Sequence, residues 1–359
     1  MQFLTTLTAA LSVFVAAATA FPATSEAPAA AALHARAVYP TKGEPPYSQN
    51  VTDYKGAITC LPATLGSAPG GVVLLIHGTG STGGESWLHG PYTDILPTLS
   101  PGFDVCYLTL PYRALRDAQV SAEYVVYAVK SLALKSATKK VSIIGHSQGA
   151  GVNPQWAMAY WPSILKKISS YVAISGDFRG VFGNVTDAGV STKNLTVLSP
   201  SLFQQFAGSH YMAAQNRIAP AALTVNTTSI YSAFDEVVRP SSSKLDGAAN
   251  FLIQDLCGPI IVDHFLQVVE FSTFALAYDA LLNGKADASR FKKTYCNTYV
   301  NGSKKKLINV LPNLYAVAAD IANIVFTNKS PGEPLLKPYV CAKDASVPAA
   351  NCGDSGYFP

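Results

Sequence analysis

The 359-residue sequence predicts an α/β fold built on a mostly parallel, doubly wound sheet. Two observations lead to this prediction. Short continuous apolar runs alternate with longer segments of helical periodicity, and short loops rich in Gly and Pro separate them. Hydrophobic residues make up 49% of the chain and charged residues only 13%, which is enough apolar sequence for a sizeable core. No internal repeat is visible.

The predicted elements follow one another in α/β order. Residues 39–70 mix Pro, Gly and polar residues, and we expect them to wrap the surface before the sheet begins. Apolar runs predict strands at 71–77, 103–110, 141–144, 168–174 and 224–231. The run at 260–265 is expected to be a further strand that ends beside His264. Helical spacing predicts helices at 118–134, 153–164, 266–282 and 307–325.

One long stretch, residues 178–219, lacks regular periodicity and is rich in Ser, Pro and Gly at its centre. An insertion at the carboxyl ends of parallel strands is where a cap or a substrate-binding lid is expected. We therefore predict a single catalytic domain at 39–359 with a small cap region at about 178–219.

The N-terminus has the pattern of a secreted protein. Residues 1–20 are expected to be a signal peptide, because their apolar centre ends in the small-x-small sequence Ala-Thr-Ala. Residues 21–38 are rich in Ala and Pro, cannot build a core, and are expected to form a pro-segment. The apolar centre is too short for a membrane anchor, so no transmembrane segment is predicted.

Cysteines and glycosylation sequons agree with secretion. The even set of six cysteines has no Cys-x-x-Cys spacing, which favours disulfides over a metal site, although spacing alone leaves fifteen pairings open. Six Asn-x-Ser/Thr sequons start at Asn50, Asn184, Asn194, Asn226, Asn301 and Asn328. Pro331 follows the last sequon and makes it the weakest candidate. We predict a secreted, extracellular glycoprotein.

The strongest functional motif is Gly-x-Ser-x-Gly at residues 145–149, directly after an apolar run and before a helix-capable segment. In this arrangement a sharp strand-to-helix turn exposes the serine Oγ at the top of a sheet. Both glycines suit such a turn because a Cβ would clash there. We interpret Ser147 as a nucleophile, with the N–H of Gln148 facing a developing oxyanion. The alternative is a glycine-rich turn without a catalytic role.

A second glycine-rich loop, residues 77–84, follows the first predicted central strand. It lets backbone N–H groups approach a ligand closely, and α/β hydrolases place their other oxyanion donor after an early strand. A phosphate-binding loop is the alternative, but no Gly-Lys-Ser/Thr follows, which excludes a Walker loop. His77 is interpreted as structural, because a later histidine is better placed for catalysis.

A nucleophilic serine needs a base, and the base needs an acid that orients it. In α/β hydrolases these residues follow the serine in the order acid, then histidine. Asp235 follows the strand at 224–231, and His264 lies in the next predicted strand-to-helix loop, so both are expected at the carboxyl edge of the sheet. We predict Asp235 as the acid and His264 as the base; the alternative for His264 is a buried structural histidine.

Three other carboxylates compete with Asp235. Asp177 also follows a strand and stays open as an alternative acid or as a hydrogen-bonding residue of the pocket. Asp263 neighbours His264, and adjacent side chains diverge; Glu236 competes by proximity alone.

Other function classes lack support. No His/Cys/Asp cluster has metal-ligand spacing and no Rossmann fingerprint is present, so neither a metal nor a cofactor is expected. The net charge of +4 comes from scattered lysines, and the densest run, 304–306, has no interleaved aromatic residues. A nucleic-acid partner is therefore not predicted.

At these residues the chain resembles the fungal lipase B family (Candida antarctica lipase B type), across residues 45–359. The resemblance rests on the segments 74–83, 147–149, 231–238, 257–264 and 335–339. It implies an α/β-hydrolase fold and a triacylglycerol lipase or carboxylesterase that forms an acyl-enzyme and is able to transesterify. It also implies an ester or lipid substrate, including one at a lipid–water interface; a monomer is expected.

The resemblance also implies residue roles. Ser147, Asp235 and His264 match the triad, while Thr79 and Gln148 match the oxyanion hole, Thr79 with both its N–H and its hydroxyl. Positions that line the pocket in the family correspond to Asp177, Gln205, Val237, Val317 and Ile324. The implied disulfides are Cys60–Cys106, Cys257–Cys296 and Cys341–Cys352.

One position departs from the family pattern. The best-known member has Trp immediately before the nucleophile, where this chain has His146. His146 is therefore a substrate-binding candidate, and the family's pocket size and alcohol selectivity do not carry over. Two alternatives to a lipase stay open: a cutinase-like esterase for short chains or polyesters, and a non-catalytic binding protein on the same fold. The second is disfavoured because every triad and oxyanion position is filled.

Overall fold

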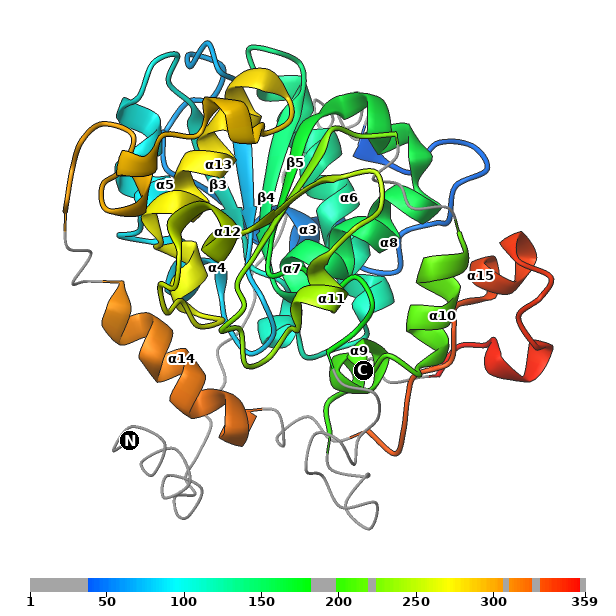
Figure 1. Ribbon diagram of the computed structural model, residues 1–359. Helices are drawn as coiled ribbons and strands as arrows, with labels where there is room; N and C mark the ends of the chain where they lie inside the picture. Colours follow the sequence, from blue (N-terminus) through cyan, green and yellow to red (C-terminus); the bar gives the residue numbers. More distant parts are fainter. Residues whose placement is uncertain (1–37, 182–197, 219–223, 306–309, 325–329, 356–359) are drawn as a thin grey trace.

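The computed structural model describes residues 38–181, 198–218, 224–305, 310–324 and 330–355. Within these ranges one sheet runs through the molecule in the order β1-β3-β2-β4-β5-β6-β7 (Figure 1). β1 pairs antiparallel with β3, and all other neighbours pair in parallel. The strands are β1 Ile58–Cys60, β2 Val72–Ile76, β3 Asp104–Leu108, β4 Val141–His146, β5 Ile168–Ile174, β6 Thr227–Tyr231 and β7 Ala249–Leu252. The mostly parallel, doubly wound sheet is confirmed.

The five strands from β2 to β6 lie where apolar runs predicted them. Helices cover both faces of this part of the sheet, so β2, β4 and β6 are buried at every position. Alternate side chains along a strand point to opposite faces, and this alternation divides the interior into two cores. Val72, Leu74 and Ile76 belong to one core, and Val73 and Leu75 to the other.

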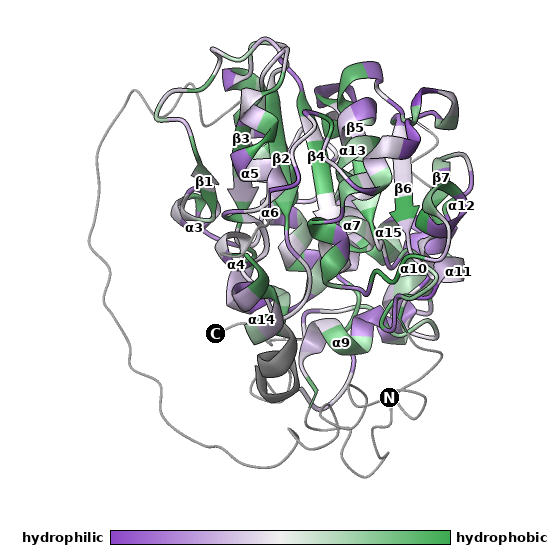
Figure 2. Cartoon of the chain, turned by 60° about the vertical axis from the view of Figure 1, so that its left-hand side comes forward, coloured by the Kyte–Doolittle hydropathy of each residue, from purple (hydrophilic) through white to green (hydrophobic). Residues whose placement is uncertain are grey.

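Two layers of helices close these cores. The first core is closed by α3 Val51–Gly56, α6 Ala118–Lys135, α8 Asn153–Tyr160, α10 His210–Arg217 and α15 Pro338–Lys343. The second is closed by α4 Gly83–Trp87, α5 Pro91–Asp94, α12 Ile253–Cys257, α13 Phe271–Asn283 and α14 Leu311–Ile324. Figure 2 shows the apolar residues concentrated along the central strands, between these helices.

The prediction that residues 39–70 only wrap the surface was wrong, because β1 lies in this stretch. β1 is a three-residue edge strand with only partly buried side chains, so it carries no apolar run that a sequence pattern could reveal. It pairs with the free edge of β3, and its Cys60 lies opposite Cys106 in the register. The disulfide between these two cysteines joins the strands covalently.

The strand predicted at 260–265 is also absent. The chain there has no strand or helix before Leu266, and Ile261 is 77% exposed. Gly258, with φ +78°, and Pro259 break the backbone before the run. The strand that precedes His264 is β7 at Ala249–Leu252, which pairs with β6.

The predicted helices exist, with shifted ends. The helix expected at 153–164 ends at Tyr160, because Pro162 starts a separate 3₁₀ turn over Pro162–Lys167. The helix expected at 266–282 begins at Phe271, after the short turn Leu266–Val268. In the helix expected at 307–325, α14 covers Leu311–Ile324, and residues 307–309 lie outside the described residues.

The predicted cap stretch, 178–219, is described in part. It contains α9 Pro200–Gln205 and α10, while residues 182–197 lie outside the described residues. Figures 1 and 2 show α9 and α14 at the same end of the molecule as α7 Gln148–Gly151, which follows directly after β4. These helices therefore lie beyond the carboxyl ends of the parallel strands, where ligands bind in open α/β sheets.

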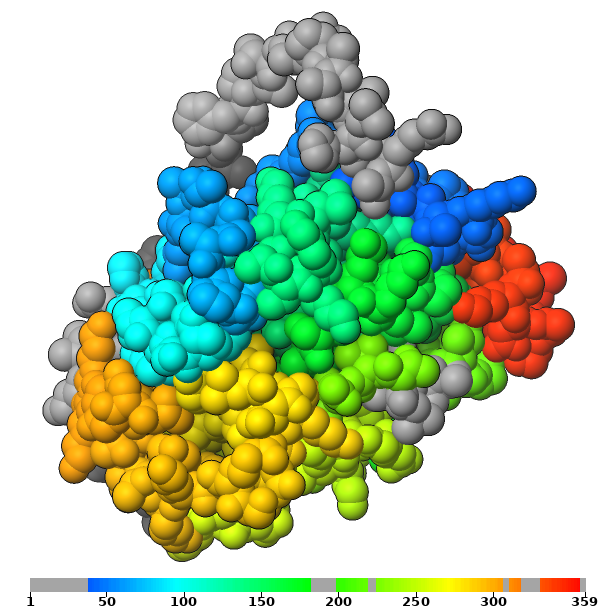
Figure 3. Space-filling view, turned by 90° about the horizontal axis from the view of Figure 1, so that it is seen from above, coloured from blue at the N-terminus to red at the C-terminus, as the bar shows by residue number. Residues whose placement is uncertain are grey.

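The two ends of the described chain share the first core. Val38 is buried, and its carbonyl accepts a hydrogen bond from the Tyr47 hydroxyl at 2.8 Å. Leu336 and Val340 of the C-terminal segment join the same core. In Figure 3 the first described residues (blue) and the C-terminal segment (red) lie on the same side of the molecule.

The six cysteines form three disulfides, Cys60–Cys106, Cys257–Cys296 and Cys341–Cys352, in the pairing that the family resemblance implied. Among the helices in the described ranges, none has the length and apolar character needed to cross a bilayer.

Candidate active site

The Gly-x-Ser-x-Gly motif forms the turn between β4 and α7. Ser147 has φ 55° and ψ −126°, a backbone conformation that a residue with a Cβ rarely adopts. A Cβ on Gly145 would lie 2.0 Å from the carbonyl oxygen of Gly149, and one on Gly149 would lie 2.2 Å from that of His77. Only glycine fits at either position, which is the geometry that places a serine at the top of a sheet.

The loop after β2 packs directly against this turn. A Cβ on Gly78 would lie 2.8 Å from Cβ of Ser147, so Gly78 allows the loop to reach the serine. The next residue, Thr79, donates its hydroxyl to Oε1 of Gln148 at 2.6 Å and is 3.1 Å from Oε1 of Gln205. Gln205 Nε2 donates in turn to Oε1 of Gln148 at 3.1 Å. Thr79, Gln148 and Gln205 therefore form one polar cluster beside Ser147.

His77, at the end of β2, is held in a structural role. Its Nδ1 lies 2.7 Å from the carbonyl oxygen of Gly78, and its Nε2 lies 2.9 Å from the backbone nitrogen of Leu110. Nδ1 therefore donates and Nε2 accepts. Burial lowers the pKa of His77 to about 4, so the ring is neutral at neutral pH.

Asp235 and His264 meet from two different loops, after β6 and after α12. His264 Nδ1 lies 3.0 Å from both carboxyl oxygens of Asp235. Asp235 Oδ1 also accepts from the backbone nitrogens of Val237 and Val238, at 3.0 and 2.7 Å. These bonds hold the carboxylate in one orientation and leave His264 Nε2 as the free nitrogen of the ring.

The pKa values of this pair move apart. Burial alone would raise the pKa of the Asp235 carboxyl, but the neighbouring His264 and the donated hydrogen bonds lower it to about 2. Burial opposes a charge on His264, yet the Asp235 carboxylate outweighs it and raises the pKa of the imidazole above its ordinary value. The pair therefore stabilises an imidazolium, which is the form a general base reaches after it takes a proton.

The competing carboxylates have other partners. Glu236 accepts from the backbone nitrogen of His264 at 3.1 Å, and Asp263 accepts from that of Leu266 at 2.7 Å. Neither bonds the imidazole. A residue that the sequence analysis missed, Gln267, donates to Oδ2 of Asp235 at 3.0 Å. Its only sequence signal is its position three residues after the histidine, on the next turn.

His146, the residue before Ser147, contacts His264. Its ring centroid is 4.6 Å from that of His264, and its Nε2 is 2.9 Å from the carbonyl oxygen of His264. Burial, and next the proximity of His264, lower the pKa of His146 to about 3. It is therefore a neutral donor at neutral pH that links the nucleophile turn to the loop of the base.

Asp177, which follows β5, is fully buried beside the nucleophile helix. A Cβ on Gly151 would lie 2.5 Å from its Oδ1. Neither carboxyl oxygen of Asp177 accepts a hydrogen bond within the described residues. Burial raises its pKa to about 7. The imidazole of His264 is bonded by Asp235 and not by Asp177, so the geometry favours Asp235 as the orienting acid.

Of the three candidates for the apolar wall of the pocket, two have side chains within the part that the structure describes. Val237 is half-buried on the loop of Asp235, and Val317 is buried on α14. Ile324 is the last residue of α14, and its side chain lies outside what the structure describes. Of the sequons, Asn50, Asn226 and Asn301 are exposed, while Asn184, Asn194 and Asn328 lie outside the described residues.

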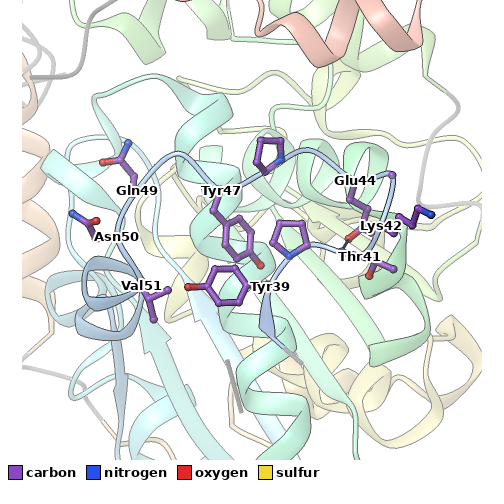
Figure 4. A pocket seen from close by; sticks show the side chains of 11 residues that line it. Tyr39, Thr41, Lys42, Glu44, Tyr47, Gln49, Asn50 and Val51 are labelled. Atoms are coloured by element: carbon purple, nitrogen blue, oxygen red, sulfur yellow. Dashed lines mark hydrogen bonds between the residues drawn. The ribbon is translucent and has the colours of Figure 1, made fainter. Parts of the chain in front are cut away.

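Two surface cavities lie apart from these residues. One of about 500 Å³ is lined by residues 39–51, and Figure 4 shows the rings of Tyr39 and Tyr47 close together beneath the loop that forms it. Another of about 750 Å³ borders Thr82, Tyr112 and Arg113. Neither is lined by a triad candidate. No cluster of His, Cys, Asp or Glu in the described ranges is arranged to hold a metal ion.

The arrangement contains the groups that acyl transfer requires, in one place. Among the hydrogen bonds of the described residues, none joins Ser147 Oγ to His264. Such a bond often forms only when substrate is bound. Gln148 begins α7, and a backbone N–H in the first turn of a helix has no partner within the helix. It is therefore free to donate to a substrate oxygen.

The chain is similar to known lipases over most of its length. No family model matches the chain. Lipase B from Pseudozyma antarctica is 32% identical over 319 residues, which cover 84% of this chain and 87% of that protein. The crystal structure of Aspergillus fumigatus lipase B superimposes with a TM-score of 0.71 and 28% identity, covering 84% of this chain and 74% of that chain.

A more distant likeness concerns the fold alone. The crystal structure of a Bacillus licheniformis lipase in its propeptide form has a TM-score of 0.50 and 15% identity, and covers 63% of this chain and 53% of that one. The similarity to lipase B is higher in sequence identity and in coverage, and it extends over more than four fifths of both sequences. The chain therefore belongs to the lipase B family and is a carboxylic ester hydrolase with an α/β-hydrolase fold.

Proposed function

We propose that the protein cleaves its ester substrates through a covalent acyl-enzyme formed on Ser147, with His264 as general base and Asp235 as the orienting acid. One observation carries the proposal. His264 Nδ1 lies 3.0 Å from both oxygens of Asp235, and the residue before Ser147 bonds the carbonyl of the same histidine. These contacts support a nucleophile, a base and an acid contributed by three loops of the chain.

In the first half-reaction, His264 Nε2 accepts the proton of Ser147 as Oγ attacks the ester carbonyl carbon. The Asp235 carboxylate stabilises the resulting imidazolium and holds the tautomer in which Nε2 is the base. Collapse of the tetrahedral intermediate breaks the bond to the alcohol oxygen, which takes the proton back from His264. The products of this half-reaction are the free alcohol and the acylated serine.

The oxyanion hole is formed by the N–H of Gln148 and by the N–H and hydroxyl of Thr79. Thr79 and Gln148 lie against Ser147, and their side chains hold each other at 2.6 Å. In this proposal the Thr79 hydroxyl turns from Gln148 Oε1 to the substrate oxygen as negative charge develops. One such donor typically contributes about 3 kcal/mol of transition-state stabilisation.

In the second half-reaction a water molecule, activated by His264, attacks the acyl-enzyme and releases the carboxylic acid. An alcohol in place of water yields a new ester, which is transesterification. Asp177, Gln205, His146, Val237, Val317 and Ile324 are proposed to line the substrate pocket. Burial disfavours the charged form of the Asp177 carboxyl, which suits a pocket for an uncharged ester.

We propose a triacylglycerol lipase rather than a short-chain esterase. Phe234 and Ile261, next to Asp235 and near His264 in the sequence, are 44% and 77% exposed, and large apolar side chains there favour contact with a lipid surface. The predicted leader at 1–20, the disulfides and the exposed sequons support a secreted, glycosylated protein. We place the end of the pro-segment before Val38, because that residue is buried.

The test is hydrolysis of p-nitrophenyl esters from acetyl to palmitoyl by the purified protein and by Ser147→Ala. We expect activity that persists to long chains and falls by about 10³-fold or more in the variant, with unchanged secretion and folding. A profile confined to short chains would retain the mechanism and favour the cutinase-like esterase. Activity that survives Ser147→Ala would refute the proposed nucleophile.

A further inference from the structure

A strained turn next to the candidate site forms hydrogen bonds and an ion pair with the loop that carries Thr79. The turn covers Pro111–Ala114, and Arg113 within it contacts residues of the loop 79–85 at several points. We propose that Arg113 is a positioning residue of the oxyanion hole, which it holds in its active geometry through Gly80. This inference rests on the proposed function, because it assigns Thr79 as an oxyanion donor.

The first interaction is a pair of hydrogen bonds with the backbone of Gly80, the residue after Thr79. Gly80 N donates to the carbonyl oxygen of Arg113 at 2.8 Å, and Arg113 Nε donates to the carbonyl oxygen of Gly80 at 2.7 Å. Both polar backbone groups of Gly80 are therefore engaged by one residue. The peptide units on either side of Gly80 are fixed, and the N–H of Gly80 is not available to a substrate oxygen.

The second interaction is an ion pair between Arg113 and Glu85. The Arg113 guanidinium lies 2.6 Å from Glu85 Oε2, and the same oxygen accepts from the backbone nitrogen of Thr82 at 2.9 Å. Glu85 is in addition the partner of Thr82 in a capping box at the start of α4. One guanidinium thus links the middle of the loop, at Gly80, to its far end, at Thr82.

The backbone of the turn indicates that this contact is specified. Tyr112, Arg113 and Ala114 have φ of 49°, 61° and 60°, so three consecutive residues other than glycine adopt the left-handed conformation. Each is disfavoured by its Cβ, and such a run persists only where surrounding contacts stabilise it. Here the carbonyl and the side chain of Arg113 reach the same residue, Gly80, and Ala114 is fully buried.

On the other side of Thr79, the loop packs against Ser147. Gly78 packs on Ser147, and Gly80 is hydrogen-bonded to Arg113. Thr79 lies in the chain between these two contacts. An oxyanion hole lowers the barrier because its donors are oriented before the charge develops. Without Arg113 the donors of Thr79 would have to be ordered in each turnover. The cost would appear in the transition state rather than in ground-state binding.

The experiment compares Arg113→Met, Arg113→Lys and the control Arg290→Met. Arg290 forms a guanidinium–carboxylate pair of similar exposure with Asp279, and Asp279 and Arg290 are not part of the candidate site. For each purified protein we would measure kcat and KM on p-nitrophenyl butyrate, the inhibition constant of a trifluoromethyl ketone, and the melting temperature. The ketone forms a tetrahedral adduct with the serine and so reports on the oxyanion hole.

We expect Arg113→Met to lower kcat by about 10- to 100-fold with a change in KM below about threefold. The inhibition constant should rise by the same factor as kcat/KM falls. Arg113→Lys keeps one donor and should restore part of kcat, while Arg290→Met should keep it. A purely structural role would instead lower the melting temperature of Arg113→Met and leave kcat of the folded fraction unchanged. That result would overturn the inference.

Failure of this inference can be told apart from failure of the proposed function. If Ser147→Ala is inactive while Arg113→Met keeps wild-type kcat and ketone affinity, the acyl-enzyme mechanism stands and Arg113 has no positioning role. If Ser147→Ala keeps its activity, the proposed function itself is refuted.

Discussion

Two buried carboxyls of the candidate site, Asp235 and Asp177, have pKa values shifted in opposite directions. Asp235 accepts hydrogen bonds from His264, Val237, Val238 and Gln267, and its pKa is lowered to about 2. Asp177 has no such donor to its carboxyl oxygens within the described residues, and burial raises its pKa to about 7. Both side chains are removed from water, and the difference follows first from the charge of His264 beside Asp235 and then from the hydrogen bonds that Asp235 accepts.

This contrast predicts opposite contributions to stability. Asp235 stabilises the folded state above the unfolded carboxyl pKa of 3.8, and the contribution is lost as pH falls towards 2. Asp177 keeps its proton in the folded state until about pH 7, whereas in the unfolded chain it ionises near 3.8. The contribution of Asp177 to stability should therefore decline as pH rises from about 4 to 7, because the unfolded state releases a proton that the folded state retains.

Asp177→Asn should abolish this decline, because the amide is close in shape and cannot ionise. We expect the free energy of unfolding of the variant, relative to the parent, to increase between pH 4 and pH 8 by about 4 kcal/mol at most. Urea unfolding at both pH values measures it. Parallel pH profiles of the two proteins would show that Asp177 does not carry the shifted pKa.

At the scale of elements, the β4–α7 turn shows how local sequence determines a catalytic geometry. Its two glycines are required by backbone atoms 2.0 to 2.2 Å from any added Cβ, and those atoms belong to the turn itself and to the neighbouring strand β2. Because a backbone atom cannot rotate away as a side chain can, the requirement is strict. At Gly145 the requirement is also short-range, because the atom that excludes a Cβ belongs to Gly149, four residues later in the motif.

Two glycines offer a matched test. Gly149→Ala should destabilise the fold by about 3 kcal/mol and displace Ser147, because the new methyl group meets the carbonyl oxygens of His77 and Ile76. At Gly84, in α4, a Cβ would meet its nearest neighbour at 3.5 Å, an ordinary contact. Gly84→Ala should change stability by less than about 1 kcal/mol. Chemical denaturation and esterase activity measure both; equal effects would contradict the packing argument.

At the scale of the whole molecule, the two ends of the sheet differ. Helices α9 and α14 lie beyond the carboxyl ends of the strands, as Figure 1 shows, and Ser147 directly follows the carboxyl end of β4. Beside Asp235 and His264, the side chains of Phe234 and Ile261 are exposed to solvent. If the proposed function holds, exposed apolar side chains close in sequence to Asp235 and His264 are expected to contact the lipid surface that holds the substrate.

Ile261→Ser should therefore lower activity on emulsified tributyrin several-fold, and leave activity on dissolved p-nitrophenyl acetate within about twofold of the parent. Exposed apolar side chains each contribute about 1 kcal/mol or more on transfer from water, which supports an effect of this size. Leu134→Ser is the control, because Leu134 is 38% exposed near the end of α6, and the chain from there enters the amino end of β4. Equal losses in the two variants, or equal losses on both substrates, would argue against a lipid-contacting face.

The sequence by itself determined the doubly wound sheet, the five strands β2 to β6, and the serine turn. Each depends on continuous apolar runs that bury a parallel strand, or on a contact between residues close in the chain, such as that of Gly145 with Gly149 around Ser147. The order of the acid and the histidine along the chain indicated Asp235 and His264 before any geometry was known. Their hydrogen bond is consistent with that prediction.

Only the tertiary structure decided the rest. The edge strand β1 is defined by its pairing with β3, and the loop of His264 is not a strand because Ile261 faces solvent. The hydrogen bonds from Gln267 to Asp235 and from Arg113 to Gly80 join residues about 30 positions apart in the chain. No periodicity or motif encodes such pairs, because their partners become neighbours only after separate elements have packed together.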